Sequence, residues 1–384
     1  MNNFKFQTVR TIINEQGGVS GLGRLIAELE YASALIVTDS GIVKAGHLAR
    51  IEAGFSAAGI AAAYYPDIGP DPQESMVLAA VEAGRAAGCD CVIGIGGGSV
   101  MDVAKAASVL LKTGCSLNEI YGVEQIKGGR LPLILIPTTA GTGSEVTASS
   151  VISSADGKKN VAIDATLYPD IALLDVDMIK TMPRQIATTT GIDAIVHAIE
   201  GYTSATRKNP ISDMLACEAL RYLLGNIEAS VADDATDDIR SRMLLGAMLA
   251  GQAFANATVA AVHAFAYALA EGFHLAHGLS NSLVLVPVLK FNIAKFPELY
   301  GQLSKAVLPE AGQLSDAAAA DLFVARLEDV MAAIGLDKRL RDFGIGEGDL
   351  EALAKVTSGL ERLLNNNPRP ISYDDALEIF TQAF

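Results

Sequence analysis

A carboxylate and several histidines in the second half of the chain are residue types that bind metals. Three of the chain's five histidines lie in the stretch VHAFAYALAEGFHLAHG, residues 262–278. Upstream, Asp193 and His197 are four residues apart, a spacing that places both side chains on one face of a helix. With His263 and His277 they make a complete ligand set for a divalent first-row metal. The sequence therefore predicts a metal site built from these four residues.

Each of these side chains also has a purely structural interpretation. Asp193 could cap the start of a helix, and His197 and His263 could be hydrogen-bonded histidines of a core. Metal binding accounts for all of them together, because a charged or half-polar group in apolar surroundings is costly unless it is paired. The helix that carries His263 is expected to end beside Gly278, and the remaining histidine, His47, is expected on the surface.

A glycine-rich turn in the first half has the form of a phosphate site. Residues 92–105 read VIGIGGGSVMDVAK, an apolar run followed by three glycines and a helical pattern. Glycines let a ligand approach the backbone, and a helix N-terminus offers unpaired N–H groups and a partial positive charge to a pyrophosphate. The same residues fit an ordinary strand-to-helix turn, in which Ser99 caps the helix and Asp102 completes a capping box. The turn is neither a P-loop nor a clean GxGxxG, so both interpretations stay open.

Two more polar groups follow apolar runs in this half. The turn IPTTAGTGSEVT carries hydroxyls that are suited to line one side of a dinucleotide, at Thr138, Thr139, Thr142 and Ser144. Asp39 ends the run ALIVTD, where its carboxylate is suited to accept hydrogen bonds from an adenosine ribose and to repel the extra phosphate of NADP. An Asx-turn or a helix cap is the alternative for Asp39.

The elements that must position these groups follow from the hydrophobic pattern of the first half. Short runs rich in Val, Ile and Leu alternate with helical patterns, at residues 34–39, 91–98, 132–139 and 171–175. Strands that are apolar throughout and alternate with helices predict a parallel sheet covered by helices on both faces.

The second half has a different pattern. Near Met182 and Pro183 the strand signal fades and long helical patterns take over, one of them continuous over residues 241–273. We therefore predict an α/β dinucleotide-binding domain at residues 1–181 and an all-helical metal-binding domain at residues 182–384.

Composition limits the class of protein. The 384 residues are 50% hydrophobic and 19% charged, which allows a sizeable core, and the formal net charge is −15. A field of that sign repels nucleic acid and anionic membranes. No stretch has the form of a signal peptide or a membrane span, and the four cysteines are expected to be buried, reduced thiols. These features favour a cytoplasmic globular protein.

Four motifs, in this order, resemble the iron-containing (group III) alcohol dehydrogenases: GGGSVMDVAK, PTTAGTGSEVT, GIDAIVHAIEGYTS and VHAFAYALAEGFHLAHGLSN. The resemblance extends over nearly the whole chain. It implies a dehydroquinate synthase-like fold, an α/β nucleotide-binding domain plus an all-helical metal domain, with the active site between them. It also implies a nicotinamide cofactor, NAD rather than NADP, and Fe²⁺ or Zn²⁺ held by Asp193, His197, His263 and His277.

The resemblance also implies a set of cofactor contacts. The residues that face the pyrophosphate are Gly96, Gly97, Gly98 and Ser99. The residues that flank the cofactor are Thr138, Thr139 and Thr142. Lys159 contacts the ribose, Asp39 favours NAD, and Asp71 is a further cofactor contact. The chain departs from the family at one place: many members have a histidine four residues after His263, where this chain has Tyr267, and His274 precedes the last ligand. Tyr267 or His274 is therefore a candidate proton relay, and lining the pocket is the alternative for both.

The predicted activity is hydride transfer between a small alcohol or aldehyde and the nicotinamide. A carbon–oxygen lyase or cyclase that uses NAD transiently is one alternative, and a non-catalytic metal-binding relative is another. The family forms dimers and sometimes larger assemblies, for which the N-terminal segment FKFQTVRTII is the expected strand. Phe254, Val259 and Phe265 suggest a modest substrate pocket.

Overall fold

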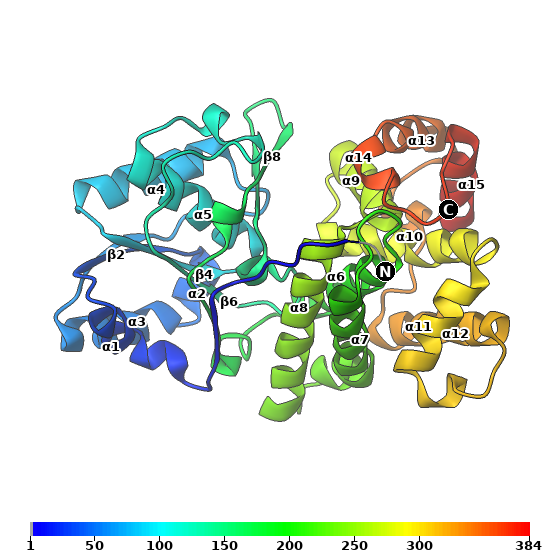
Figure 1. The fold of residues 1–384 in the computed structure, drawn as a ribbon, viewed down its shortest axis with the longest axis horizontal. Helices are drawn as coiled ribbons and strands as arrows, with labels where there is room; N and C mark the ends of the chain where they lie inside the picture. The colour runs from blue at the N-terminus through cyan, green and yellow to red at the C-terminus, as the bar shows by residue number, and fades with distance from the viewer. Residues whose placement is uncertain (1–2) are drawn as a thin grey trace. The chain divides into compact units, whose positions relative to one another are not determined.

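The computed structural model describes residues 3–384, which form two compact units (Figure 1). One unit is Gln7–Met182, and the other is Pro183–Phe384 together with residues 3–6. The first unit holds all of the described strands, and the second consists of helices and their connections. This is the fold class predicted from the sequence.

A parallel sheet of six strands is the centre of the unit Gln7–Met182. Its order is β1-β9-β6-β4-β2-β3, and every neighbouring pair is parallel. The strands are β1 (Thr11–Asn14), β2 (Ser33–Val37), β3 (Ala61–Tyr65), β4 (Cys91–Gly96), β6 (Leu133–Pro137) and β9 (Ile171–Leu174). The four predicted strands are present as β2, β4, β6 and β9. The edge strand β1 overlaps the end of the N-terminal segment that was expected to be a strand. The other edge strand, β3, was not predicted, because its sequence AAAYY has no Val, Ile or Leu and is only partly buried.

Alternate residues of the inner strands enter two separate cores. Leu35 and Val37 of β2 pack with the helices α4 (Glu74–Ala86) and α5 (Gly98–Thr113). Ala34 and Ile36 face the other way, toward α1 (Leu22–Glu28) and α3 (His47–Ala58). Figure 1 shows these two helical layers on opposite faces of the sheet. Burial on both faces explains why these strands are apolar at every position.

A second, smaller sheet was not predicted. Its order is β5-β8-β7, formed by β5 (Gly122–Val123), β8 (Lys159–Ile163) and β7 (Ser149–Ser153), and β7 and β8 are antiparallel. Its strands are short and mix polar with apolar residues, so they give no run that stands out in the sequence.

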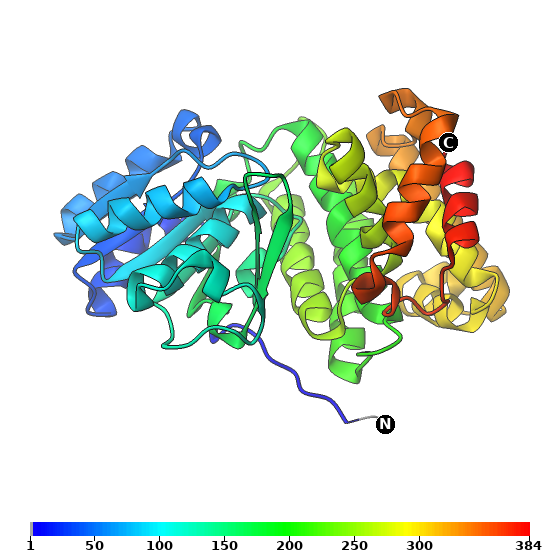
Figure 2. The ribbon, with the colours of Figure 1, turned by 90° about the horizontal axis from the view of Figure 1, so that it is seen from above.

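Figure 2 shows the second unit as a group of helices, from green to red, and within it α7, α8 and α10 pack against α6. Their bounds are α6 (Arg184–Thr203), α7 (Pro210–Ser230), α8 (Asp237–Ala257), α9 (Ala261–Phe273), α10 (His277–Ile293), α11 (Pro297–Val307), α12 (Asp316–Ile334), α13 (Leu350–Ser358), α14 (Glu361–Leu364) and α15 (Tyr373–Ala383). Every residue of α6 from Gly191 to Thr203 is buried, because α7, α8 and α10 cover it from several sides. A helix surrounded in this way is apolar all round, and each polar side chain on it needs a partner.

The continuous helical pattern predicted over residues 241–273 is wrong at its centre. The chain leaves α8 after Ala257 and resumes as α9 at Ala261, with a bend of 101° between the two helices. Thr258 at the break has a φ of 73°, a left-handed backbone that a β-branched residue rarely adopts. Helical periodicity continues through the break, so the sequence pattern does not reveal it.

Three further expectations need correction. His47 is buried, not on the surface, with its Nε2 3.0 Å from the Thr181 hydroxyl. Of the four cysteines, which are all free thiols, only Cys91 is buried and the others are half-buried. Phe265 is wholly buried and packs against Phe380, at 4.8 Å between ring centroids, so it belongs to the core.

No single helix among residues 3–384 has the length and apolar character needed to cross a membrane. Two bent pairs, α8 with α9 and α10 with α11, reach that length and composition only when each pair is taken together.

Candidate functional site

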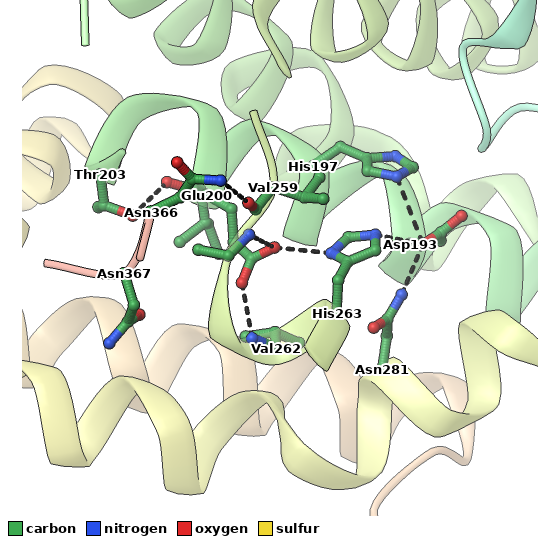
Figure 3. Close-up of polar contacts among 12 residues, drawn as sticks. Asp193, His197, Glu200, Thr203, Val259, Val262, His263, Asn281, Asn366 and Asn367 are labelled. Atoms are coloured by element: carbon green, nitrogen blue, oxygen red, sulfur yellow. Dashed lines mark hydrogen bonds and ion pairs between the residues drawn. The ribbon is translucent and has the colours of Figure 1, made fainter. Parts of the chain in front are cut away.

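The four predicted metal ligands converge on one carboxylate oxygen. Asp193 Oδ1 lies 3.8 Å from His197 Nε2, 3.7 Å from His263 Nε2 and 3.5 Å from His277 Nε2. The ligand atoms of Asp193, His263 and His277 all lie within 4.8 Å of one another. The His197 ring stacks on the His263 ring at 4.8 Å between centroids, and both rings lie beside Asp193 (Figure 3).

Three helices supply these side chains. Asp193 and His197 come from consecutive turns of the buried helix α6, as their spacing predicted. His263 is on the first turn of α9, and His277 is the first residue of α10. The helix of His263 therefore does not extend to Gly278 as expected, because α9 ends at Phe273.

Position 278 is a glycine for a reason other than the end of a helix. A Cβ at this position would lie 2.2 Å from the carbonyl oxygen of Thr189, so only glycine lets α10 begin this close to α6. The close approach brings His277 next to Asp193.

The donor set fits a divalent cation. Two ligand atoms that each lie about 2.1 Å from one cation are roughly 3–4 Å from each other. The distances from Asp193 Oδ1 to the three imidazole Nε2 atoms fall in this range. His263 Nε2 is buried and makes no hydrogen bond with any described residue, although a buried imidazole nitrogen normally has a partner. Burial alone would raise the pKa of Asp193, but the three imidazoles and the Asn281 amide outweigh it and lower that pKa, so the carboxylate stays charged.

Glu200 holds His263 in place, and the sequence analysis missed it. Its carboxylate accepts hydrogen bonds from the backbone N–H groups of Ala260 at 2.8 Å and Val262 at 2.6 Å, and lies 2.6 Å from His263 Nδ1 (Figure 3). An ionised carboxylate only accepts, so the Nδ1 of His263 carries the proton and the Nε2 lone pair is directed at the cluster. The position was detectable, because Glu200 follows His197 by three residues on the same helix.

Replacing Glu200 with glutamine is expected to weaken metal binding by about 10- to 100-fold. The amide has one acceptor oxygen where the carboxylate has two, so either Val262 loses its partner or an N–H₂ group faces His263 Nδ1 and favours the wrong tautomer. Competition with a chelator of known affinity measures the effect. Glu271, which is exposed on the same helix α9, offers the matched control Glu271→Gln, which should bind metal as the wild type does. Wild-type affinity in Glu200→Gln would contradict this role.

Two other neighbours of the cluster lie on α10 and α8, and the first of them, Asn281, was missed by the sequence analysis. Asn281 Nδ2 donates to Asp193 Oδ1 at 2.6 Å, from a position one turn after His277 on α10. The Phe254 ring, which was expected to line a substrate pocket, stacks on the His197 ring at 4.2 Å between centroids.

The two candidate relay residues occupy different environments. The Tyr267 ring lies 5.7 Å from the His277 ring, centroid to centroid, and is half-buried. His274 is exposed and ends α9 in the left-handed conformation, with a φ of 54°. The geometry therefore favours Tyr267 over His274 as the group next to the metal ligands.

The predicted cofactor residues lie at the carboxyl ends of three adjacent strands. Asp39 follows β2, Gly97 follows β4 and Thr138 follows β6, and these strands are neighbours in the sheet. From β2 the chain goes to β3, toward one edge of the sheet, whereas from β4 it goes to β6, toward the opposite edge. The strand order therefore reverses between the neighbouring strands β2 and β4. Open parallel sheets bind ligands at such a switch point, outside the carboxyl ends of the strands.

The glycine turn and the threonine turn face each other there. A Cβ on Gly98 would lie 3.0 Å from the Thr142 methyl group, and one on Gly97 would lie 3.6 Å from that of Thr139. The Thr139 hydroxyl is buried and makes no hydrogen bond with any described residue. Ser99 does not cap the helix, because α5 begins at Gly98 with Gly97 as its N-cap, so the capping-box alternative is wrong. Unpaired amides at a helix N-terminus and an unsatisfied hydroxyl suit a pyrophosphate.

The other cofactor candidates are engaged within the protein. Asp39 accepts hydrogen bonds from the N–H groups of Gly41 and Ile42 and caps α2 (Ser40–Lys44), which is the alternative named for it above. Lys159 and Asp71 form an ion pair at 2.8 Å, which places Asp71 beside the first residue of β8. A bound ribose would have to share these groups with their present partners.

Comparisons with known proteins agree with this geometry. Residues 10–176 match the family model described as iron-containing alcohol dehydrogenase, and residues 187–384 match that of the C-terminal part of the same family. The long-chain-alcohol dehydrogenase 1 of Geobacillus thermodenitrificans is 36% identical over 96% of this chain and 94% of its own. The chain belongs to the iron-containing alcohol dehydrogenase family.

Solved structures lead to the same conclusion. A 1,3-propanediol oxidoreductase is similar with a TM-score of 0.95 and 28% identity, over the whole of both chains. A sulfoacetaldehyde reductase from Bifidobacterium kashiwanohense, in complex with NAD⁺, is similar with a TM-score of 0.89 and 25% identity, over 100% of this chain and 99% of that one. The protein is therefore an alcohol dehydrogenase or aldehyde reductase of this family, and neither a lyase nor a non-catalytic relative fits these comparisons.

Proposed function

We propose that Asp193, His197, His263 and His277 hold Fe²⁺ or Zn²⁺, and that NAD binds along the carboxyl ends of β2, β4 and β6. The observation that carries the proposal is the single carboxylate oxygen faced by three imidazole nitrogens in a buried, helical setting. The metal supplies Lewis-acid polarisation of the substrate oxygen, and the nicotinamide supplies the hydride chemistry.

The chain's own residues prepare the site for this chemistry. Asp193 is buried and ionised, so it contributes the negative charge that a divalent cation needs in an apolar interior. Glu200 fixes the tautomer and direction of His263. The Tyr267 ring lies beside that of His277, which supports Tyr267 as the residue that would pass a proton to or from the substrate oxygen, and His274 is the second candidate.

The residues proposed to contact the cofactor would also select NAD over NADP. Amides at the start of α5 and the hydroxyls of Thr138, Thr139 and Thr142 would hold the pyrophosphate. Asp39 would disfavour the extra phosphate of NADP, because the two charges repel each other. Lys159 would reach the ribose from β8.

The protein loaded with Fe²⁺ or Zn²⁺ is expected to reduce NAD with a simple alcohol, and to do so less well with NADP. Absorbance of the reduced nicotinamide measures turnover across a panel of alcohols and aldehydes. Chelation should abolish turnover and added metal should restore it. Equal rates before and after complete metal removal would contradict the proposal, as would product formation without net production of NADH.

The partners and compartment complete the proposal. A small alcohol or aldehyde is the substrate, and the working form is a homodimer or a larger homo-oligomer in the cytoplasm. Residues 11–13 of the N-terminal segment are already paired with β9 as part of strand β1, so contact with a second copy would involve its first, exposed residues, Phe4 and Lys5.

A further inference from the structure

Three residues connect α8 to α9, and their backbone departs from both helix and strand. Thr258 has a φ of 73° and a ψ of 157°, a combination that is essentially restricted to glycine. Ala260, with a φ of −138° and a ψ of −131°, also lies outside the regions that side chains favour. The Thr258 hydroxyl is buried and makes no hydrogen bond with any described residue. A backbone as strained as this persists only where its surroundings impose it.

One peptide group in this connection is held from both sides. It joins Val259 to Ala260, and its carbonyl oxygen and N–H group point in opposite directions because the peptide bond is planar and trans. The Asn366 amide donates to the Val259 carbonyl oxygen at 3.2 Å (Figure 3). The Glu200 carboxylate accepts from the Ala260 N–H at 2.8 Å. The peptide plane therefore cannot rotate without the loss of a hydrogen bond, and the direction in which α9 begins is set.

The Asn366 side chain is itself fixed in orientation. Its amide nitrogen donates a second hydrogen bond, at 3.1 Å, to the carbonyl oxygen of Arg362, and its oxygen accepts one from the Thr206 hydroxyl. Carbonyl oxygens only accept, so the amide nitrogen must face Val259 and Arg362. The backbone carbonyl of Asn366 also accepts from the Ala205 N–H at 2.8 Å. Asn366 thus joins the α6–α7 loop to the α8–α9 connection.

The next residues anchor this C-terminal segment on α10. The side-chain amides of Asn367 and Asn292 are both buried and bind each other through two hydrogen bonds, at 2.8 and 2.9 Å. The Arg369 guanidinium donates to the Phe291 carbonyl oxygen at 2.7 Å and lies over the Phe291 ring. Asn366 is therefore mounted on the same helix that supplies the metal ligand His277.

The position of His263 depends on the α8–α9 connection. His263 lies three residues after Ala260, whose carbonyl oxygen accepts from the Ala264 N–H at 3.1 Å in the first turn of α9. A rotation of the peptide before Ala260 would turn this first turn and move His263 Nε2, which lies 3.7 Å from Asp193 Oδ1. Stability alone does not account for the arrangement, because glycine at position 258 would adopt the same backbone without strain.

We propose that Asn366 is a positioning residue for the metal site, which together with Glu200 holds the strained α8–α9 connection and so directs His263 at the other ligands. The inference rests on the proposed function, because it takes the cluster around Asp193 to be the metal site. Asn366 is not a ligand, and it acts through the peptide that it holds.

Replacement of Asn366 by alanine tests the inference. The Asn366→Ala protein is expected to bind Zn²⁺ about tenfold more weakly, because the peptide between Val259 and Ala260 keeps only one of its two partners. Competition with a chelator of known affinity measures the binding, at a temperature where urea unfolding shows that both proteins are folded. Asn365→Ala, at the exposed preceding position, is the matched control and should bind Zn²⁺ as the wild type does.

Two further variants separate positioning from a general loss of stability. Glycine at position 258 adopts the required backbone readily, so Thr258→Gly combined with Asn366→Ala should restore part of the lost Zn²⁺ affinity. Thr206→Val removes the partner of the Asn366 oxygen, and should weaken Zn²⁺ binding in the same direction by a smaller factor. It carries the test if Asn366→Ala does not fold.

The outcomes distinguish this inference from the proposed function. Unchanged Zn²⁺ affinity in Asn366→Ala, or in Thr206→Val where only that variant folds, would overturn the inference and leave the proposed function intact. A double variant that binds Zn²⁺ no more tightly than Asn366→Ala would overturn it too, since relief of strain would then have no effect. Failure of the wild-type protein to bind Zn²⁺ or Fe²⁺ would overturn both.

Discussion

Replacement of His263 by alanine is expected to abolish tight metal binding and turnover together. His263 Nε2 is one of three imidazole nitrogens around the Asp193 oxygen, and it is held there by Glu200. A bound Lewis acid supplies several kcal/mol of transition-state stabilisation, so its loss should lower turnover by about a thousandfold or more. Metal content of the purified protein and the rate of NADH formation are the two measurements. NADH binding should persist, because the cofactor turn belongs to the other unit.

Glu271→Ala is a matched control for this variant. Glu271 is exposed and lies on the same helix, α9, so its replacement changes a charged residue near the end of that helix without touching the cluster. It should keep both metal and turnover. Full activity of His263→Ala after its metal has been removed would show that the cluster is not the catalytic centre.

Replacement of Gly278 by alanine is expected to have the second largest effect. The new Cβ would lie 2.2 Å from the Thr189 carbonyl oxygen and 2.7 Å from its carbon, contacts that real atoms do not make. Because both partners are backbone, α10 must move away from α6, at a cost of about 2–3 kcal/mol in the free energy of unfolding. The displacement moves His277, the adjacent residue, so metal affinity should fall as well. Urea unfolding and chelator competition measure the two effects.

Gly225 provides the comparison for this substitution. It lies on α7 in the same unit, and a Cβ there would meet nothing within 4 Å. Gly225→Ala should leave metal affinity unchanged and raise the unfolding free energy by up to about 1 kcal/mol, through helix propensity alone. Equal stability of the two alanine variants would mean that the α6–α10 contact is not as tight as the structure has it.

The sequence could propose this set of metal ligands because the proposal depends on residue types and on one local spacing. Asp193 and His197 are four apart on a helix, which sets their common direction without any tertiary information. Glu200 extends the same face by one turn, so its role was accessible too, although the sequence analysis assigned it none. His263 and His277 were chosen for their chemistry, and nothing in their spacing showed that a helix break would separate them.

A different helix break, the one between α8 and α9, depends on contacts distant in sequence. Between α8 and α9 the chain turns at Thr258, and the first free amides of α9 are taken by Glu200, about 60 residues away in the chain. Hydrophobic periodicity indicates which residues are buried, but it does not indicate where a buried helix ends and the chain turns. The helical pattern in the sequence therefore continues through the break at Thr258. His47 was misplaced for a similar reason, because its burial comes from packing near Thr181 and not from its own neighbours.

The sequence by itself determined the alternation of buried strands with helices, the glycine and threonine turns, and the set of metal-ligand types. These are encoded locally, in runs and spacings of a few residues. Only the tertiary structure decided which strands are neighbours, that Gly278 must be glycine to let two helices touch, and that Lys105 and Asp102 hold the threonine turn and strand β7 against one helix. Those features depend on packing between segments far apart in the chain, and a single sequence carries no record of such distances.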